Sequence, residues 1–501
     1  MNNLVVQHGE TVVDHWRQSR LFVLLLVLVF FLPLPLGLNR EWAWSLFEGG
    51  VFLLAALWLY EFAVERIVIS KVFYRARWLL LCLFIVVLWQ LFQLLPLPLS
   101  LLSSLSSQAA QHYSNVPGYT VGDYFSISLD LYATWQSVLL SLALFVLFAL
   151  VLLLVTDRHR LRLMLYVMFY AGLLQAVLAS IFLFGSWEGL SSGVTNSVSK
   201  SGEFEFSAGT FVNRNHLAGF LEMTISVGIG LLLTRLSRHS PSRWRERLIQ
   251  LVSVIIGNKA RVRLMLIIMI IVLVLTHSRM GNMAFFLSFF TTSLVLLFAS
   301  MRRREKNKSL FTPAIVLLLS MLIVDLFIVG NWFGVDRIVE RVGNTTVATE
   351  DRSDVFSDTI EMGKQYWLTG VGGGAFASSF PAYQSSNYYQ IYDHVHNDYL
   401  EFAVELGVPV LSLLSVVVIY SLGSAFWAMI RTVSRFYGGV AFAAFMGIFS
   451  ILLHSLADFN LRIPSNAAYF VVLLAVAIIA RYHIDEPKTT VPDACKVQTD
   501  M

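Results

Sequence analysis

The sequence has little charge and almost no cysteine. Only 14% of its 501 residues are charged and 57% are hydrophobic, whereas soluble domains are typically about 25% charged and 45–50% apolar. These shares exclude a soluble globule and predict a polytopic membrane protein. The two cysteines, Cys82 in an apolar run and Cys495 near the C-terminus, cannot form a disulfide across an external loop. The loops must therefore hold themselves together without one.

Apolar runs long enough to cross a ~30 Å hydrocarbon core, roughly 20 residues each, recur along the chain. The first follows Arg17 and Arg20 like a signal sequence, but no small-x-small cleavage site follows it, so we expect a retained helix. The seventh and eighth runs are short and are interrupted at residues 277–279. Twelve spans in an all-α fold are predicted: 21–38, 42–60, 78–97, 133–155, 163–186, 216–234, 263–276, 281–300, 311–331, 401–429, 437–457 and 466–481.

The distribution of basic residues orients these spans. With the N-terminus inside, 27 of the 36 Lys and Arg residues fall in inner segments, as the positive-inside rule requires. Both termini are then cytoplasmic. The large outer segments are 98–132, which has no Lys or Arg, 187–215 and 333–400. The expected organisation is an N-terminal bundle of about nine helices (1–332), a large outer loop (333–400), C-terminal helices (401–482) and a tail (483–501).

The outer segment 333–400 is too long to be structureless, because loops of that length are usually functional or folded. Apolar residues recur in it at helical spacing: Val355, Phe356, Ile360, Tyr366 and Trp367. We therefore expect a helix along the membrane surface between Arg352 and Trp367, ended by the glycines at 370–374. That glycine run resembles a phosphate-binding loop, but turn formation explains it better. No strand pattern of consequence is present.

Ionisable residues beside membrane spans are by default candidate functional groups. The densest group is His394, His396 and the two aspartates of 393–398, followed by Glu401 and Glu405 one helical turn apart. Because a long apolar run follows, residues 398–407 are expected to form the first turns of a membrane helix. Its acids would then lie at the positive end of the helix dipole.

Three further polar groups are predicted at the same outer face. Arg214 and His216 open the sixth span with Glu222 further in, Arg279 follows the seventh beside His277, and His454, Asp458 and Arg462 end the eleventh. Helix-end arginines usually extend to the lipid headgroups. Arg214 and Arg279, however, stand on a sparsely basic face with a histidine within two residues, which favours a functional role. The i, i+4 spacing of His454 and Asp458 favours a mutual hydrogen bond at the helix end.

The spacing His394-x-His396-x-Asp398 also occurs in zinc hydrolase sites. Tyr399 stands where a further histidine would be needed, and the motif opens a helix instead of following a strand, so a metal site is not favoured. A neutral His396 acting as a base is better supported, since imidazole titrates near neutral pH and nearby acids can orient it.

Two outer arginines suit a pyrophosphate, because their planar, permanently charged groups bind its oxygens bidentately. Arginines can also stabilise a leaving diphosphate, so no metal or cofactor is required. A histidine beside them could take a proton from a sugar hydroxyl. A lipid-linked sugar diphosphate at the outer leaflet satisfies these demands.

Seven motifs in this order resemble the O-antigen ligase and polymerase superfamily of bacterial envelopes. They cover most of residues 80–480 and are fairly specific for the superfamily, but they separate its members poorly. They are WQLFQLLPLP at 89–98, SLDLYAT at 128–134, TFVNRNHLAG at 210–219, THSRMG at 276–281, the turn at 370–376, HVHNDYLE at 394–401 and the segment 454–464.

The resemblance implies a metal-independent, inverting membrane glycosyltransferase related to the GT-C fold, with no cofactor. Its donor would be a glycan on undecaprenyl diphosphate, at the periplasmic face of the bacterial inner membrane. By position, Arg214 and Arg279 look like the essential arginines that hold the diphosphate. His396 looks like the histidine that activates the acceptor, and Arg352 like a further loop arginine. The other expected substrate-binding residues are His216, His394, Asn397 and Glu405. The chain has Ser-Arg-Met-Gly at 278–281 where Ser-Arg-Gly-Gly is commoner.

Several functions remain open at the level of sequence. Ligation to a lipid A core and polymerisation of a growing glycan differ only in the acceptor, and which of His394 and His396 is the base is not determined. Protein O-glycosylation would need an acceptor-binding domain that is not evident. A twelve-span transporter matches the helix count. Such carriers, however, place polar residues near mid-membrane between two similar halves, whereas here the polar residues collect at one face and the two halves do not match.

Overall fold

The computed structural model describes residues 15–115, 124–184, 209–234, 258–302, 347–385 and 391–483. The span predicted at 311–331 lies outside these ranges. The N-terminal half contains α1 (His15–Phe31), η1 (Leu36–Leu38), α2 (Glu41–Ala63), α3 (Lys71–Arg75), α4 (Arg77–Gln93), β1 (Leu97–Pro98), α5 (Leu99–Leu105), α6 (Ser107–Ser114), β2 (Tyr124–Phe125), α7 (Leu131–Leu154), α8 (Arg158–Phe184) and α10 (Arg214–Thr234).

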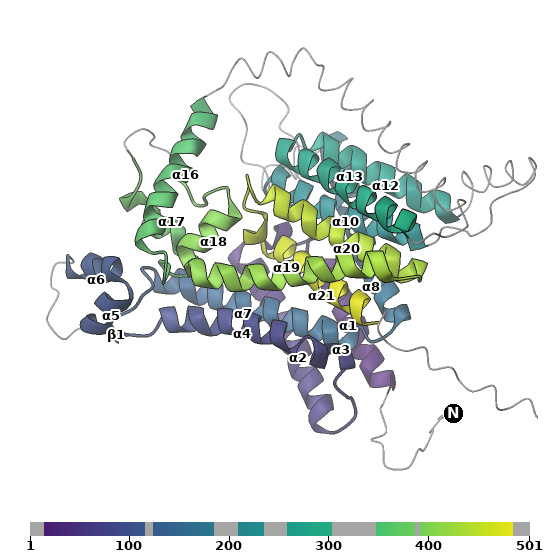
Figure 1. The fold of residues 1–501 in the computed structure, drawn as a ribbon, viewed down its shortest axis with the longest axis horizontal. Helices are drawn as coiled ribbons and strands as arrows, with labels where there is room; N and C mark the ends of the chain where they lie inside the picture. The colour runs from purple at the N-terminus through teal and green to yellow at the C-terminus, as the bar shows by residue number, and fades with distance from the viewer. Residues whose placement is uncertain are drawn as a thin grey trace, which may run out of the picture.

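The rest of the described chain is also helical (Figure 1). It contains α12 (Asn258–Leu275), α13 (Arg279–Arg302), α16 (Val347–Gln365), α17 (Phe376–Ser379), η3 (Phe380–Ala382), α18 (Asp398–Leu406), α19 (Val408–Arg431), α20 (Arg435–His454), η4 (Asn460–Arg462) and α21 (Pro464–Tyr482).

Eight of the described helices are long and apolar enough to cross a membrane: α2, α7, α8, α10, α13, α19, α20 and α21. The shorter apolar helix α4 and the helices α1 and α12 lie at three further predicted spans. Eleven of the twelve predicted apolar runs therefore contain helices. The short seventh and eighth runs, which are interrupted at residues 277–279, are two separate helices, α12 and α13. The chain is an all-α polytopic membrane protein.

Helix α10 lies at the centre of the bundle, because 94% of its most apolar window is buried inside the protein. It packs along α20, where a Cβ placed on Gly230 would collide with the backbone oxygen of Gly439. Small residues allow such close approach of helix backbones, which is a common way for membrane helices to associate. The polar residues at the ends of α10 and α20 are thereby held at fixed separations.

The prediction of one continuous helix from residue 398 into the apolar run is wrong. The chain breaks at Gly407, with φ 83° and ψ 154°, into α18 and α19. The backbone of 367–372 crosses the end of α18: the amides of Val371 and Gly372 donate to the carbonyls of Val404 and Glu405, at 2.9 and 3.1 Å. Pro409 has no N–H to bond the Glu405 carbonyl from a continuing helix, so the crossing segment satisfies that carbonyl instead.

Described residues between 97 and 129 and between 355 and 404 share a second hydrophobic core, apart from that of the membrane helices. The predicted outer helix is present as α16, and its buried residues include Val355 and Met362. Tyr366, just after its end, is also buried, whereas Ile360 is 46% and Trp367 55% exposed. The only strands among the described residues are β1 and β2, which pair antiparallel over two residues each. Gln93 joins this core to the break, since its amide donates to the carbonyls of Thr369 and Glu405.

The crossing at Gly370 and Gly407 gives a first testable prediction. Both glycines have positive φ, and a Cβ on Gly370 would collide with the Glu405 carbonyl. We expect Gly370→Ala to lower the free energy of unfolding by at least the roughly 1–3 kcal/mol that a strained backbone costs. Thermal unfolding in detergent measures this. Gly423→Ala is the control, since a Cβ there meets nothing within 4 Å; equal midpoints for the two variants would contradict the crossing.

Candidate functional site

Three of the four polar groups predicted from the sequence meet around the ring of Phe459. His394 stacks on this ring at 4.2 Å between centroids, and His216 and His396 contact it edge-on at 4.6 and 4.8 Å. These histidines come from the start of α10 and from the segment before α18, while Phe459 lies between α20 and α21. The structure therefore brings three histidines from distant parts of the chain around one side chain.

His394 is held by a buried carboxylate. Its Nδ1 lies 2.7 Å from Oε1 of Glu401, whose Oε2 accepts a hydrogen bond from the amide of Val395 at 2.9 Å. The Nε of Arg462 lies 2.9 Å from the same Oε1. Burial alone would raise the pKa of Glu401, but His394 and Arg462 together lower it. Glu401 is therefore a charged anchor for His394.

Arg462 bridges two carboxylates one helical turn apart on α18. Besides Glu401 it forms an ion pair with Glu405, whose other oxygen accepts from the amide of Phe376. The guanidinium also lies over the ring of Phe402, 4.2 Å from its centroid. Both oxygens of Glu405 are therefore occupied within the protein, and the substrate contact predicted for it stays a prediction.

Asn397 and Asp398 fix the start of α18. The side-chain oxygen of Asn397 caps the helix by accepting from the amides of Tyr399 and Leu400, and its Nδ2 donates to the carbonyl of Leu456. Substrate binding was predicted for Asn397, but its side chain is engaged in these contacts. Oδ2 of Asp398 accepts from Ser455 Oγ at 2.6 Å and from the amide of Leu461 at 3.1 Å. Burial raises the pKa of Asp398 to about 7, although these hydrogen bonds lower it.

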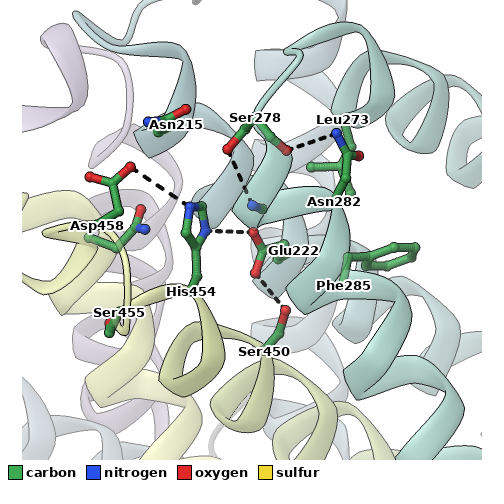
Figure 2. A network of polar contacts seen from close by, with 12 residues as sticks. Asn215, Glu222, Leu273, Ser278, Asn282, Phe285, Ser450, His454, Ser455 and Asp458 are labelled. Atoms are coloured by element: carbon green, nitrogen blue, oxygen red, sulfur yellow. Dashed lines mark hydrogen bonds and ion pairs between the residues drawn. The ribbon is translucent and has the colours of Figure 1, made fainter. Parts of the chain in front are cut away.

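The mutual hydrogen bond predicted for His454 and Asp458 is absent. Nε2 of His454 is 3.9 Å from Oδ2 of Asp458, whereas Nδ1 lies 2.8 Å from Oε1 of Glu222 on α10 (Figure 2). Ser450 donates to the other oxygen of Glu222 at 2.5 Å. All three side chains are fully buried, and a buried carboxylate on a neighbouring helix outcompetes a loop residue one turn away.

Arg214 and Arg279 begin two neighbouring helices, α10 and α13. A Cβ on Gly281 would lie 2.8 Å from Cβ of Ala218 and 3.0 Å from Oε1 of Glu222, so the first turn of α13 packs on the first turns of α10. Figure 2 shows their neighbours Asn215 and Ser278 at the same end. Both arginines are exposed, and within the described ranges neither has a carboxylate partner.

This arrangement provides positive charge without an internal counter-ion. Two helix N-termini, each the positive end of a helix dipole, lie beside two arginines, which is a favourable environment for an anion. Arg352 lies on α16, but its side chain is outside the described part of the structure. Sequence reasoning did not identify Phe459, Ser450 or Ser455, because an aromatic residue and two serines in a polar turn carry no signal of their own.

Removal of Arg462 should destabilise the protein strongly. Arg462→Met leaves Glu401 and Glu405 buried without their cation, and breaking a buried ion pair typically costs about 3–5 kcal/mol. Thermal or denaturant unfolding in detergent measures the loss. Lys364→Met is the control, because the Lys364–Glu361 pair is exposed and such pairs contribute less than about 1 kcal/mol. Similar stabilities for the two variants would be inconsistent with the bridge.

Asp398 should make stability depend on pH. Its pKa is raised from 3.8 to about 7 in the folded protein, so between these values the folded chain keeps a proton that the unfolded chain has released. The contribution is therefore complete below the unfolded pKa and is lost as the pH rises through about 7. We expect the unfolding midpoint of the wild type to fall more than that of Asp398→Asn between pH 5 and 8. The exposed Asp393→Asn variant should follow the wild type; parallel curves for wild type and Asp398→Asn would refute this.

Residues 264–415 match a family model described as O-Antigen ligase, a range that contains Arg279, His394, His396 and Glu401 but not Arg214, Asp458 or Arg462. No curated protein matches the chain. The match supports a ligase- or polymerase-type function in polysaccharide biosynthesis. It supports the resemblance noted in the motifs, since residues 264–415 are similar to the O-antigen ligase family.

Proposed function

We propose that the protein transfers a saccharide from undecaprenyl diphosphate to an acceptor hydroxyl at the periplasmic face of the bacterial inner membrane. The observation that carries this proposal is the placement of Arg214 and Arg279 at two packed helix N-termini, beside a cluster of carboxylate-held histidines. The basic residues of the loops support the orientation, with both termini cytoplasmic.

The two arginines would bind the diphosphate of the donor. Guanidinium groups donate two parallel hydrogen bonds to phosphate oxygens, and the positive ends of the two helix dipoles favour the same negative charge. When the bond between the anomeric carbon and the phosphate oxygen breaks, negative charge grows on the leaving diphosphate. Arginines already in position stabilise that charge in the transition state.

A histidine would accept the proton of the attacking hydroxyl. The resemblance assigns this role to His396, whose side chain is 24% exposed and whose Nδ1 faces Asp458 at 3.6 Å. The hydroxyl oxygen forms the new bond to the anomeric carbon, its proton moves to the imidazole, and the lipid diphosphate leaves. One displacement inverts the configuration at the anomeric carbon. His216 and His394, which contact the same Phe459 ring, would line the approach of the sugar.

The direct test is transfer in vitro. Purified protein in detergent, with chelator present, receives a radiolabelled undecaprenyl-diphosphate oligosaccharide with rough lipopolysaccharide or with no acceptor. Label on the lipopolysaccharide would assign a ligase, and a ladder of longer lipid-linked chains a polymerase. No product from folded protein with either acceptor would overturn the proposal, and a glycan on a purified pilin would then redirect it to protein O-glycosylation.

Variants of the arginines test the diphosphate site. We expect Arg214→Ala and Arg279→Ala each to lower kcat/KM by about 100-fold or more, the scale of losing a transition-state donor, with partial activity in the lysine variants. Arg40→Ala is the matched control, since Arg40 is also exposed and also stands at the start of a helix, α2. Wild-type rates in Arg279→Ala would contradict the assignment.

A further inference from the structure

Three imidazole nitrogens converge on the carboxylate of Asp458. Nδ1 of His396 and Nε2 of His216 lie 3.6 and 3.8 Å from its Oδ1, and Nε2 of His454 lies 3.9 Å from its Oδ2. Asp458 is only 1% exposed. In the described part of the chain none of these three nitrogens has a hydrogen-bond partner. Buried polar atoms are normally paired, so this convergence requires an explanation.

A second carboxylate lies behind the first. His454 contacts Glu222 through Nδ1 at 2.8 Å and faces Asp458 through Nε2. Each of its ring nitrogens thus faces an acceptor, and both contacts are attractive only when both nitrogens carry protons. The result is a row, Glu222–His454–Asp458–His396, that runs from the buried interior between α10 and α20 to a partly exposed imidazole (Figure 2 shows its first three members).

We propose that Asp458 is a positioning residue for His396, and that the Glu222–His454 pair holds Asp458 in place. Asp458 accepts the Nδ1 proton of His396, which fixes the tautomer and leaves Nε2 free to take the acceptor proton. The contact is long by a few tenths of an ångström, as is common for catalytic hydrogen bonds before substrate binds. The catalytic part of this inference rests on the proposed glycosyl transfer.

Charge balance explains why such a row would help. With His454 doubly protonated and His396 neutral, the two carboxylates leave the row with one net negative charge. When His396 takes the hydroxyl proton, the row becomes neutral. The attraction between the new imidazolium and the carboxylate is stronger where water is excluded, because the local dielectric constant is low. Burial would raise the pKa of Asp458, but His396, His216 and His454 lower it, so its carboxylate remains available as the counter-charge.

The groups that face this row come from every element packed around it. They are His216 on α10, His394 in the segment before α18, and Asp398 at the start of α18, which also acts on His454. None of these groups lies on the Nδ1 side of His396. Among the described residues, the carboxylate within 4 Å of Nδ1 is that of Asp458. Asp458 is thus the residue whose charge should control proton uptake there.

The test compares Asp458→Asn with wild type and with Asp458→Glu, which keeps the charge. In the transfer assay we expect Asp458→Asn to lower kcat by about 10–100-fold, within the range of acid–base catalysis, with little change in the KM for the lipid donor. The acidic limb of its pH–rate profile should move to lower pH by about one unit, because the imidazolium loses its counter-charge. Asp458→Glu should keep the limb at its wild-type position, and the exposed Asp393→Asn should keep both rate and profile.

A second readout does not depend on glycosyl transfer. Diethyl pyrocarbonate modifies unprotonated imidazole, and mass spectrometry reports modification of His396 against pH. The midpoint should be lower in Asp458→Asn than in wild type. If wild type transfers no sugar, the proposed function fails, while this midpoint still decides the coupling of Asp458 to His396. Unchanged midpoints and pH profiles would overturn the inference, as would failure of both Asp458→Asn and Asp458→Ser to fold, which would make Asp458 structural.

Discussion

The neutralisation of charge buried beside the membrane is the constraint on which the rest of the site depends. Glu401 and Glu405 project from one face of α18, and Arg462 is the cation that bridges them. An unpaired charge in such a position costs several kcal/mol, so α18 can dock only where the connection between α20 and α21 supplies Arg462. The same docking places Phe459 against the histidines and Ser455 against Asp398. One ion-pair system therefore sets the positions of several side chains.

Arg462 differs in this respect from Arg214 and Arg279. The chain provides two carboxylates for Arg462, yet within the described ranges it provides none for the two arginines that open α10 and α13. Their exposure makes the lack of a partner inexpensive, because water solvates a guanidinium well. It also leaves both groups ready for an external anion. Charges that hold the fold are thus satisfied internally, and charges that suit a diphosphate are left open at helix N-termini.

The sequence predicted the features that depend on local pattern. Hydropathy located the apolar helices, and ionisable residues near their ends identified four groups, three of which the structure brings together around Phe459. Sequence reasoning failed where a contact with a distant segment determines the local structure. The break at Gly407 follows from a backbone crossing by residues 367–372, and the partner of His454 is Glu222, 232 residues away. Residue spacing along one helix cannot predict either contact. Phe459 was also missed, because its side chain is apolar and the search was for ionisable residues.

The boundaries of the family match have a physical consequence. Residues 264–415 contain Arg279 and the histidines 394 and 396, but the groups that hold or face these histidines lie elsewhere: Arg462 and Asp458 follow α20, and Glu222 lies on α10. The matched segment therefore cannot arrange its own polar groups without the helices on either side of it. Since α10 is also the most enclosed of the candidate membrane helices that the structure describes, the site is built on a closely packed part of the bundle, where side chains can be held in a precise geometry.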